Sequence, residues 1–395
     1  MTVKIFLWSK YLKINSALKI VVITTGLRVG GAETLLLSMV KRWLDEDIEV
    51  SILSLSGIGA LDDKFREIGV DVHNYNFDGF FNRMRGIYRL IKDLRYMNPV
   101  VVQTWMPHAD LVGGLVAKMF TSAELFWGLH HANFTLDSLK ISTLAVAKMN
   151  ALLSYFVPDC VVAVSQHVKV SAIEFGFNKN NFSVIENGID FSVFRRNEDS
   201  KQRIFDELKI EDSKKLIGFV GRYSLEKRPS DFLQLASQLN QKSTDFHFVM
   251  AGDGNDKENQ ELLDLIVKNN VSENISLLGV RDDMPAIFSS LDVLVSTSVD
   301  EAFGLVLVEA LACGCPCVSS SNQGAKGIGD EFIKFVEIGD IDGFCTQVSK
   351  IVEYESGNES FSEQARKYVS AKFSVENTAK KYLDLYCRSN PKFKP

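Results

Sequence analysis

Apolar residues recur along the chain in two series of short runs, and amphipathic stretches with a helical period lie between the runs. The first series begins with Lys19–Thr25, a run that ends at Gly26, and a helical pattern from Ala32 to Leu44 follows it. Short unbroken apolar runs are typical of strands that are buried on both faces of a parallel sheet. The further runs of this series are Glu49–Leu55, Val100–Thr104, Glu124–Leu129 and Cys160–Val164.

The second series follows a break at Asn187-Gly188-Ile189-Asp190 and a polar stretch over residues 195–213. Its strand candidates are Leu216–Val220, Phe246–Ala251, Ile275–Leu278, Val293–Ser296 and Pro316–Ser319, and its helix candidates include Pro229–Leu239, Glu258–Asn269 and Leu305–Ala312. Strands that alternate with helices predict an α/β protein with parallel sheets. Two doubly wound domains in tandem are expected to bind a ligand at the carboxyl ends of their strands, where the domains face a cleft.

Composition narrows the class of protein. Apolar residues make up 46% of the 395 residues, so each half can bury a core, and the net charge of −6 argues against a nucleic-acid binder. Four of the six cysteines are scattered among apolar neighbours or crowded too closely for ordinary pairing, which suits a reducing compartment. The longest apolar region, from Ile141 to Val157, is interrupted by polar residues and predicts a well-buried helix rather than a membrane span. Met1 to Lys19 lacks the features of a signal peptide, so a cytoplasmic protein is expected.

The segment from Ser298 to Ala310 contains two glutamates, Glu301 and Glu309, eight positions apart. The first lies at a glycine-containing turn and the second lies inside the helix that follows. Carboxylates in these places suit the hydroxyls of a sugar and a ribose, while the backbone N–H groups of the turn and of the helix N-terminus suit phosphate. The segment therefore favours a nucleotide sugar as ligand.

A loop with two cations follows the first strand of the second series. Arg222 and Lys227 lie between that strand and the helix that starts at Pro229. Two cations there can neutralise a diphosphate without a metal, since arginine offers forked donors and lysine a point charge. Solvated loop charges are the alternative interpretation, and the position at a strand end favours the ligand.

The first series offers two weaker candidates. Gly30 and Gly31 lie between the first strand and its helix, where a ligand can approach the backbone, although a plain tight turn explains them equally. His130 and His131 end a strand, and one of them can hydrogen-bond to a substrate hydroxyl. A structural histidine is the alternative for this pair, and no third ligand at suitable spacing supports a metal site.

Three further segments have an ordinary structural interpretation. In a basic helix over residues 82–95, Met84, Ile87, Tyr88, Ile91 and Leu94 form one apolar stripe, which we expect to face inward, and the flanking arginines and lysine give only a modest membrane signal. Asp282 and Asp283 are expected to cap a helix that begins near Met284. The segment Cys313-Gly-Cys315-Pro-Cys317 is too closely spaced for zinc and predicts small buried residues at a turn.

In their order along the chain, these segments resemble the retaining glycosyltransferases of the GT-B fold, family 4. The resemblance covers most of the chain from Lys19 onward, and its most specific part is the Glu301-x7-Glu309 pair within residues 300–316. The resemblance implies two Rossmann-like, doubly wound domains that face a cleft. Residues 1–194 would bind the acceptor, residues 195–372 would bind the nucleotide sugar, and a helix in residues 373–395 would cross back to the first domain.

For the donor, the resemblance implies that Arg222 and Lys227, after Gly221, hold the diphosphate. Glu309 would bond the ribose hydroxyls and Glu301 the transferred sugar. The remaining donor contacts that it implies are the backbone amides of Phe303, Gly304 and Leu305, the segment Val280-Arg281 along the base, and Gly30 and Gly31 from the first domain. His130 or His131 would contact the sugar, and Glu301, Arg222 and Lys227 complete the expected catalytic set.

The activity implied by the resemblance is transfer of a hexose from a UDP- or GDP-sugar to an acceptor hydroxyl with retained anomeric configuration. The acceptor would be a lipid-linked saccharide of cell-surface polysaccharide or lipopolysaccharide synthesis, at the cytoplasmic face of the inner membrane. No metal or other cofactor is expected, because the nucleotide sugar is a substrate and two cations meet its diphosphate. A GT-B sugar-nucleotide epimerase and a non-catalytic nucleotide-sugar-binding protein remain as alternatives. The sequence departs from the family pattern at Ala302, where glycine is usual, and in the loop 324–327, which lacks a glutamate.

Overall fold

The computed structural model describes residues 18–132, 141–354 and 357–389. They belong to two compact units, one within Met1–Gly188 and Val375–Pro395 and the other within Ile189–Ser374. The chain thus passes from one unit to the other after Gly188 and again after Ser374, whereas the sequence suggested divisions after residues 194 and 372. Met1 to Lys19, which is not expected to be a signal peptide, lies almost wholly outside the described residues.

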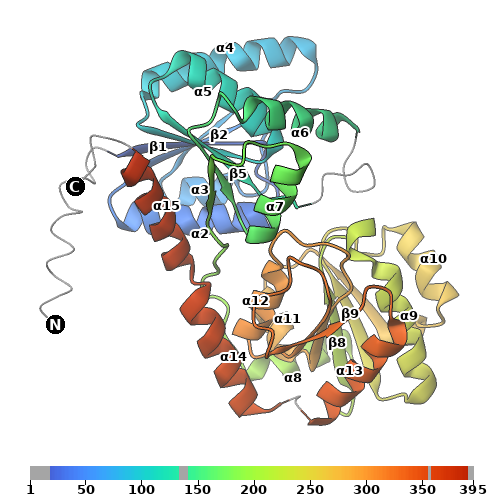
Figure 1. Cartoon of the computed structure of the whole chain (residues 1–395). Coiled ribbons are helices and arrows are strands. Elements are labelled where there is room, and N and C mark those ends of the chain that lie inside the picture. The colour runs from blue at the N-terminus through green and yellow to red at the C-terminus, as the bar shows by residue number, and fades with distance from the viewer. Residues whose placement is uncertain (1–17, 133–140, 355–356, 390–395) are drawn as a thin grey trace, which may run out of the picture. The chain divides into compact units, whose positions relative to one another are not determined.

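The first unit is built on a seven-stranded sheet in the order β3-β2-β1-β4-β5-β6-β7, and all of its strand pairs are parallel (Figure 1). Its strands are β1 (Lys19–Thr24), β2 (Glu49–Ser54), β3 (Asp71–Asn74), β4 (Val101–Trp105), β5 (Glu124–Leu129), β6 (Cys160–Ala163) and β7 (Phe182–Val184). Because β1, β4 and β5 are almost entirely buried, their apolar runs were readable in the sequence.

Helices cover both faces of this sheet, with α2 and α15 on one face and α4 and α5 on the other (Figure 1). The helices are α2 (Gly31–Asp45), α3 (Asp62–Glu67), α4 (Phe80–Met97), α5 (Gly114–Phe120), α6 (Ile141–Leu153), α7 (Gln166–Phe175) and α15 (Val375–Ser389), and a π-helix, η2 (Ala109–Gly113), precedes α5.

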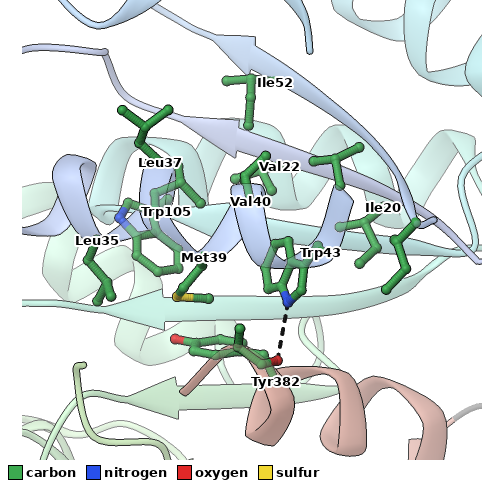
Figure 2. Close-up of a cluster of buried hydrophobic side chains, with 14 of the residues drawn as sticks. Ile20, Val22, Leu35, Leu37, Met39, Val40, Trp43, Ile52, Trp105 and Tyr382 are labelled. Atoms are coloured by element: carbon green, nitrogen blue, oxygen red, sulfur yellow. Dashed lines mark hydrogen bonds between the residues drawn. The ribbon is translucent and has the colours of Figure 1, made fainter. Parts of the chain in front are cut away.

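The last helix of the chain completes the core of the first unit. Trp43 on α2 is fully buried, and its ring meets those of Tyr382 and Tyr386 on α15 edge-on, with ring centroids 6.3 and 6.1 Å away (Figure 2). The indole Nε1 of Trp43 donates a hydrogen bond to the carbonyl oxygen of Ala379 at 3.1 Å. Apolar side chains of α2, of the sheet and of α15 therefore form one continuous cluster.

The second unit has a six-stranded parallel sheet in the order β10-β9-β8-β11-β12-β13. Its strands are β8 (Lys215–Val220), β9 (Phe246–Ala251), β10 (Ile275–Gly279), β11 (Val293–Ser296), β12 (Cys317–Ser320) and β13 (Ile333–Val336). The helices are α8 (Asp199–Leu208), α9 (Pro229–Lys242), α10 (Gln260–Lys268), α11 (Met284–Ser290), α12 (Leu305–Ala312), α13 (Ile341–Tyr354) and α14 (Glu359–Lys372), with short 3-10 turns η3 (Leu225–Lys227) and η4 (Ser272–Asn274). The polar stretch over residues 195–213 contains helix α8, which the sequence pattern did not predict.

One expectation about helices is wrong and another holds only in part. The region from Ile141 to Val157 is not a well-buried helix, because α6 ends at Leu153 and leaves the side chains of Met149 and Leu152 47% and 62% exposed. In the apolar stripe predicted for α4, Leu94 is buried and Ile87 and Ile91 are half-buried, but Met84 and Tyr88 are exposed. Among the described residues, no helix combines the length and the apolar character that crossing a bilayer requires.

Candidate functional site

The two candidate donor loops of the second unit follow neighbouring strands. β8 and β11 pair in parallel, so the segments after Val220 and after Ser296 leave the same edge of the sheet. Thr297, directly after β11, connects the two loops by hydrogen bonds. Its Oγ1 donates to the carbonyl oxygens of Lys227 at 2.8 Å and of Arg228 at 3.0 Å, which belong to the loop after β8. The backbone N–H of Val299 donates to the carbonyl oxygen of Glu226 at 2.9 Å. The fold therefore brings the cationic loop and the glutamate loop into contact.

Lys227 and Glu301 form an ion pair at the junction of these loops. The Nζ of Lys227 donates to Oε1 of Glu301 at 2.5 Å, and the hydroxyl of Ser298 donates to the same oxygen at 2.8 Å. The Glu301 side chain is only 10% exposed. Because both bonds end on Oε1, the second carboxylate oxygen of Glu301 remains as an acceptor for a ligand hydroxyl.

Arg222 adds a second cation to this place. Burial raises the pKa of the neighbouring Glu226 carboxyl, the positive charges of Lys227 and Arg222 lower it, and the negative charges of Asp300 and Glu301 raise it. Arg222 and Asp300 therefore lie in the neighbourhood of Glu226, Lys227 and Glu301. The exposed Arg222 guanidinium forms no hydrogen bond or ion pair with the described residues, which leaves its forked donors for an anion.

Glu309 lies on α12, which begins directly after Gly304. Gly304 has a φ of 76°, a left-handed conformation that suits glycine, and it turns the chain from the Glu301 loop into the helix. The partly buried carboxyl of Glu309 forms no hydrogen bond with the described residues, and burial raises its pKa to about 7. Phe303 and Leu305 flank Gly304, so their backbone N–H groups lie at the N-terminal end of α12.

The loop after β12, which the sequence analysis named only for a missing glutamate, packs against Glu301. After β12, the side-chain amide of Asn322 donates to the carbonyl oxygen of Ser298 at 3.2 Å, and the hydroxyl of Ser320 also donates to that oxygen. A Cβ on Gly324 would overlap the carbonyl oxygen of Glu301, so this loop can lie against Glu301 only with a glycine there. The absent side chain at Gly324 was the sequence signal for this contact.

Arg281 forms ion pairs with two protein carboxylates. Its guanidinium bonds to Glu207 on α8 at 2.5 and 3.0 Å and to Asp283 at 2.8 and 2.9 Å, which raises the pKa of Arg281. Asp283 occupies the N-cap position of α11 but makes no capping hydrogen bond with its side chain, so its expected capping role is wrong. The neighbouring Val280 is 56% exposed. Contact of Val280 and Arg281 with a nucleotide base stays a prediction.

In the first unit, the predicted glycines and histidines lie around Trp105. Gly30 and Gly31 form the N-terminus of α2, and the Nε1 of Trp105 donates to the carbonyl oxygen of the next residue, Ala32, at 3.2 Å. The Trp105 ring also packs on the ring of His130, with ring centroids 4.1 Å apart. β1, β4 and β5 are neighbours in the sheet, so these groups share its carboxyl edge.

His130 is a buried neutral side chain. It is 9% exposed, neither ring nitrogen has a hydrogen-bond partner among the described residues, and burial together with His131 lowers its pKa to about 3. Buried polar atoms normally have partners, so the two unpartnered ring nitrogens distinguish His130 from an ordinary structural histidine. His131 is half-buried.

The sequence analysis did not identify a buried acid that lies beside this edge of the sheet. Asp110 lies in the π-helix after β4, accepts a hydrogen bond from Thr104 Oγ1 at 2.5 Å, and has a pKa that burial raises to about 8. The preceding turn contains Met106 with a φ of 86°, an uncommon conformation for a bulky residue. Strained backbone and π-helices are frequent at functional sites.

The three closely spaced cysteines are buried, as the sequence predicted. Cys313, Cys315 and Cys317 are at most 2% exposed, and burial raises the pKa of each thiol. Within the parts of the chain that the structure describes, no cluster of three or more histidine, cysteine, aspartate or glutamate side chains is arranged to hold a metal ion.

Two protein-family models match successive parts of the chain. The model described as Glycosyltransferase Family 4 matches residues 29–193, and the model described as Glycosyl transferases group 1 matches residues 200–368. The two matching family models and the two parallel sheets define a glycosyltransferase of the GT-B type. The matches cover most of both units, and the chain belongs to the group 1 and family 4 glycosyltransferases.

Curated relatives include a galactosyltransferase. The chain is 26% identical over 314 residues to the UDP-Gal:alpha-D-GlcNAc-diphosphoundecaprenol alpha-1,3-galactosyltransferase of Escherichia coli, a match that covers 76% of this chain and 77% of that protein. It is 26% identical over 231 residues to the N-acetyl-alpha-D-glucosaminyl L-malate synthase of Bacillus anthracis, which covers 58% of this chain and only 59% of that protein.

Among solved structures, HepE of Anabaena in complex with UDP-glucose superimposes with a TM-score of 0.82 and 18% identity, over 93% of this chain and 98% of that one. At this identity the likeness establishes the GT-B fold, with its two Rossmann-like units. The expected fold class is therefore confirmed.

Proposed function

We propose that this glycosyltransferase moves a hexose from a UDP- or GDP-sugar to an acceptor hydroxyl with retention of anomeric configuration. The observation that supports the donor site most strongly is the Lys227–Glu301 ion pair, which joins a cation for the diphosphate to a carboxylate for the sugar. Arg222 and the N-terminal end of α12 add further donors for phosphate, and Glu309 offers an unpaired carboxyl for ribose.

The cations provide the main chemical assistance in this proposal. As the glycosidic bond breaks, negative charge grows on the departing diphosphate, and Arg222 and Lys227 stabilise that charge from fixed positions. Glu301 is bound to Lys227 and Ser298, which suits a group that orients sugar hydroxyls rather than a nucleophile. The acceptor therefore attacks on the face that the leaving group vacates, and the departing phosphate takes the acceptor proton. With two cations on the diphosphate, no divalent metal is required.

For the acceptor we propose a lipid-linked saccharide of cell-surface polysaccharide synthesis, used at the cytoplasmic face of the inner membrane. The name of the Escherichia coli relative specifies a diphosphoundecaprenol-linked sugar as its acceptor, which supports a substrate of that kind. In the first unit, His130 offers two unpartnered ring nitrogens to a sugar hydroxyl, next to the N-terminus of α2 at Gly30 and Gly31.

The diphosphate assignment is tested with Arg222→Ala. Removing one preorganised donor to a developing charge costs about 10²–10³-fold in turnover, so we expect a loss of that size with an unchanged melting temperature. Arg195→Ala is the matched control, because Arg195 is also an exposed arginine of the second unit and lies outside the donor loops. Near-normal turnover of Arg222→Ala would remove Arg222 from the mechanism.

The substrates are identified by incubating the enzyme with radiolabelled UDP- and GDP-sugars and a membrane lipid extract. Label in an organic-soluble product with the anomeric configuration of the donor, formed equally in the presence of EDTA, supports the proposal. An epimerised donor sugar formed without any acceptor would indicate an epimerase instead. Donor binding without transfer or hydrolysis would indicate a non-catalytic binding protein.

A further inference from the structure

Helix α4 exposes a row of side chains that the rest of the first unit does not cover. Phe81, Arg85, Tyr88 and Lys92 follow one another at intervals of four, three and four residues, so they line one side of the helix. All four are exposed, with Phe81 85% and Tyr88 70% exposed. We call this row the α4 stripe.

The opposite side of α4 is the one that packs on the unit. Gly86, Leu90 and Leu94 are buried there, about half a turn around the helix from the α4 stripe. A Cβ on Gly86 would overlap the ring of Phe77, so the helix approaches the unit closely along this side. The α4 stripe therefore points away from the sheet, and Figure 1 shows α4 as an outer helix of the first unit.

The charge of α4 is strongly positive although the whole chain has a net charge of −6. The helix contains five cationic residues and one acidic residue, Asp93. Asp93 is turned to the unit, where it accepts a hydrogen bond from the Tyr75 hydroxyl at 2.9 Å. The outer side of α4 thus presents positive charge without a neighbouring carboxylate of its own.

Three of the five cations have local partners. Arg83 donates to the carbonyl oxygen of Phe77, Arg89 lies over the Tyr75 ring, and Arg95 lies over the Phe120 ring. Arg85 and Lys92, the two cations of the α4 stripe, make no ion pair or side-chain hydrogen bond with the described residues.

Apolar exposure is concentrated at the start of the same helix. Phe80 and Met84 are 73% and 56% exposed, and the Phe80 and Phe81 rings contact each other with centroids 5.8 Å apart. Exposed aromatic rings cost free energy in water, but they are favourable in the zone between lipid headgroups and acyl chains. Interleaved cations at that depth reach lipid phosphates.

We propose that the α4 stripe, with Phe80 and Met84, docks the first unit on an anionic lipid bilayer. The helix lies in the plane of the interface, its aromatic and methionine side chains enter the headgroup zone, and Arg85 and Lys92 meet anionic headgroups. The alternation of aromatic and cationic residues favours a lipid surface over an acidic protein. The docking requires neither donor nor acceptor, so it can be tested independently of the proposed transferase activity.

The test is co-sedimentation of the full chain with vesicles of phosphatidylcholine alone or with added phosphatidylglycerol. We expect binding only to the anionic vesicles, with an affinity that falls as salt is added. Arg85→Gln with Lys92→Gln should weaken binding about 30-fold, since each cation near an anionic surface contributes about a fivefold factor. Phe81→Ser with Tyr88→Ser should weaken it at least tenfold, since the inserted apolar area is lost.

Tyr354→Ser is the matched control, because Tyr354 on α13 is 71% exposed, nearly the same as Tyr88. We expect it to bind vesicles like the unmodified chain, and all variants to keep their melting temperatures and their turnover with a water-soluble acceptor analogue. The proposal is overturned if the unmodified chain does not bind anionic vesicles, or if the α4 variants bind these vesicles as tightly as the unmodified chain. Loss of self-association in the α4 variants, without vesicle binding by the unmodified chain, would instead make this surface an interface between copies.

Discussion

The raised pKa of Glu309 predicts that the donor site reduces the stability of the empty enzyme. Burial moves the pKa of this carboxyl from the usual 4.5 to about 7. Because the folded-state pKa lies above the unfolded-state value, the folded protein holds the proton more tightly. The stability that this group contributes is complete below pH 4.5, falls as the pH rises between the two values, and levels off above pH 7. The shift corresponds to about 3 kcal/mol in total, of which about 1 kcal/mol is lost between pH 6 and pH 8.

Glu309→Gln removes this titration while keeping the size of the side chain. We therefore expect the donor-free variant to be more stable than the unmodified enzyme at pH 8, and the advantage to shrink by about 1 kcal/mol at pH 6. The measurement is urea unfolding of the second unit at the two pH values. Identical pH dependence in the two proteins would show that Glu309 is not buried as a carboxyl in solution.

The same substitution, Glu309→Gln, should weaken the binding of the nucleotide. Two charge-assisted hydrogen bonds from ribose hydroxyls are replaced by neutral ones, which costs about 1.5–3 kcal/mol, or roughly 10- to 100-fold in affinity for UDP. In the unmodified enzyme, UDP binding must also displace a proton below pH 7, so the affinity ratio of enzyme to variant should grow about tenfold from pH 6 to pH 8. Calorimetry measures both effects. A variant that binds UDP as tightly as the unmodified enzyme at pH 8 would contradict the assignment of Glu309 to ribose.

The remaining predictions concern the support of the site and the two cores. Gly324→Ala should lower turnover at least tenfold in a donor-saturated assay, with little change in melting temperature. The reason is that a Cβ at this position overlaps the carbonyl oxygen of Glu301 and displaces the loop that contains Glu301. Full activity of the variant would show that the loop adapts. Asp292→Ala should cost roughly 2 kcal/mol in urea unfolding, because the 4%-exposed carboxylate accepts bonds from Lys201 and a backbone N–H, and a change below 0.5 kcal/mol would refute this. Trp43→Ala should lower the unfolding free energy of the first unit by about 4 kcal/mol and leave that of the second unit unchanged. Calorimetry measures both values. A loss of stability in both units would contradict the division of the molecule into two separate cores.

The central strands could be predicted from sequence because burial on both faces makes most of their positions apolar. β5 and β9 begin and end where their apolar runs do. β3 and β7 lie at the two edges of their sheet and contain half-buried residues, so they leave no continuous apolar run. Apolar periodicity predicts a strand only where both faces are covered.

The exposure of Met84 and Tyr88, which were expected to face inward on α4, has a similar physical cause. Counting apolar residues at helical spacing selected a face with Met84 and Tyr88, because a helix rich in aromatic residues satisfies the period on more than one side. The side that packs inward is defined by Gly86, which hydrophobicity does not mark and which is set by close contact with Phe77. Single-sequence patterns do not contain such long-range contacts.

The candidate donor site was proposed from residue type, and its arrangement could not be read from the sequence. Arg222, Lys227 and the two glutamates were recognisable because their spacing matches a known family. The ion pair between Lys227 and Glu301 joins residues 74 positions apart, and only the parallel pairing of β8 with β11 explains it. Ser298 gave no signal in the sequence, since a short polar side chain in a loop has many ordinary uses.

Because α15 belongs to the first unit, the two units can complete their folding only in a certain order during biosynthesis. Residues 189–374 form the second unit without interruption, so a ribosome can release them as a complete folding unit. The first unit is begun earlier but lacks Tyr382 and Tyr386 until the end of the chain leaves the ribosome. The N-terminal half of the enzyme is thus the last to reach its native core, and any nascent chain that stops before Val375 exposes the apolar side of α2 to chaperones and proteases.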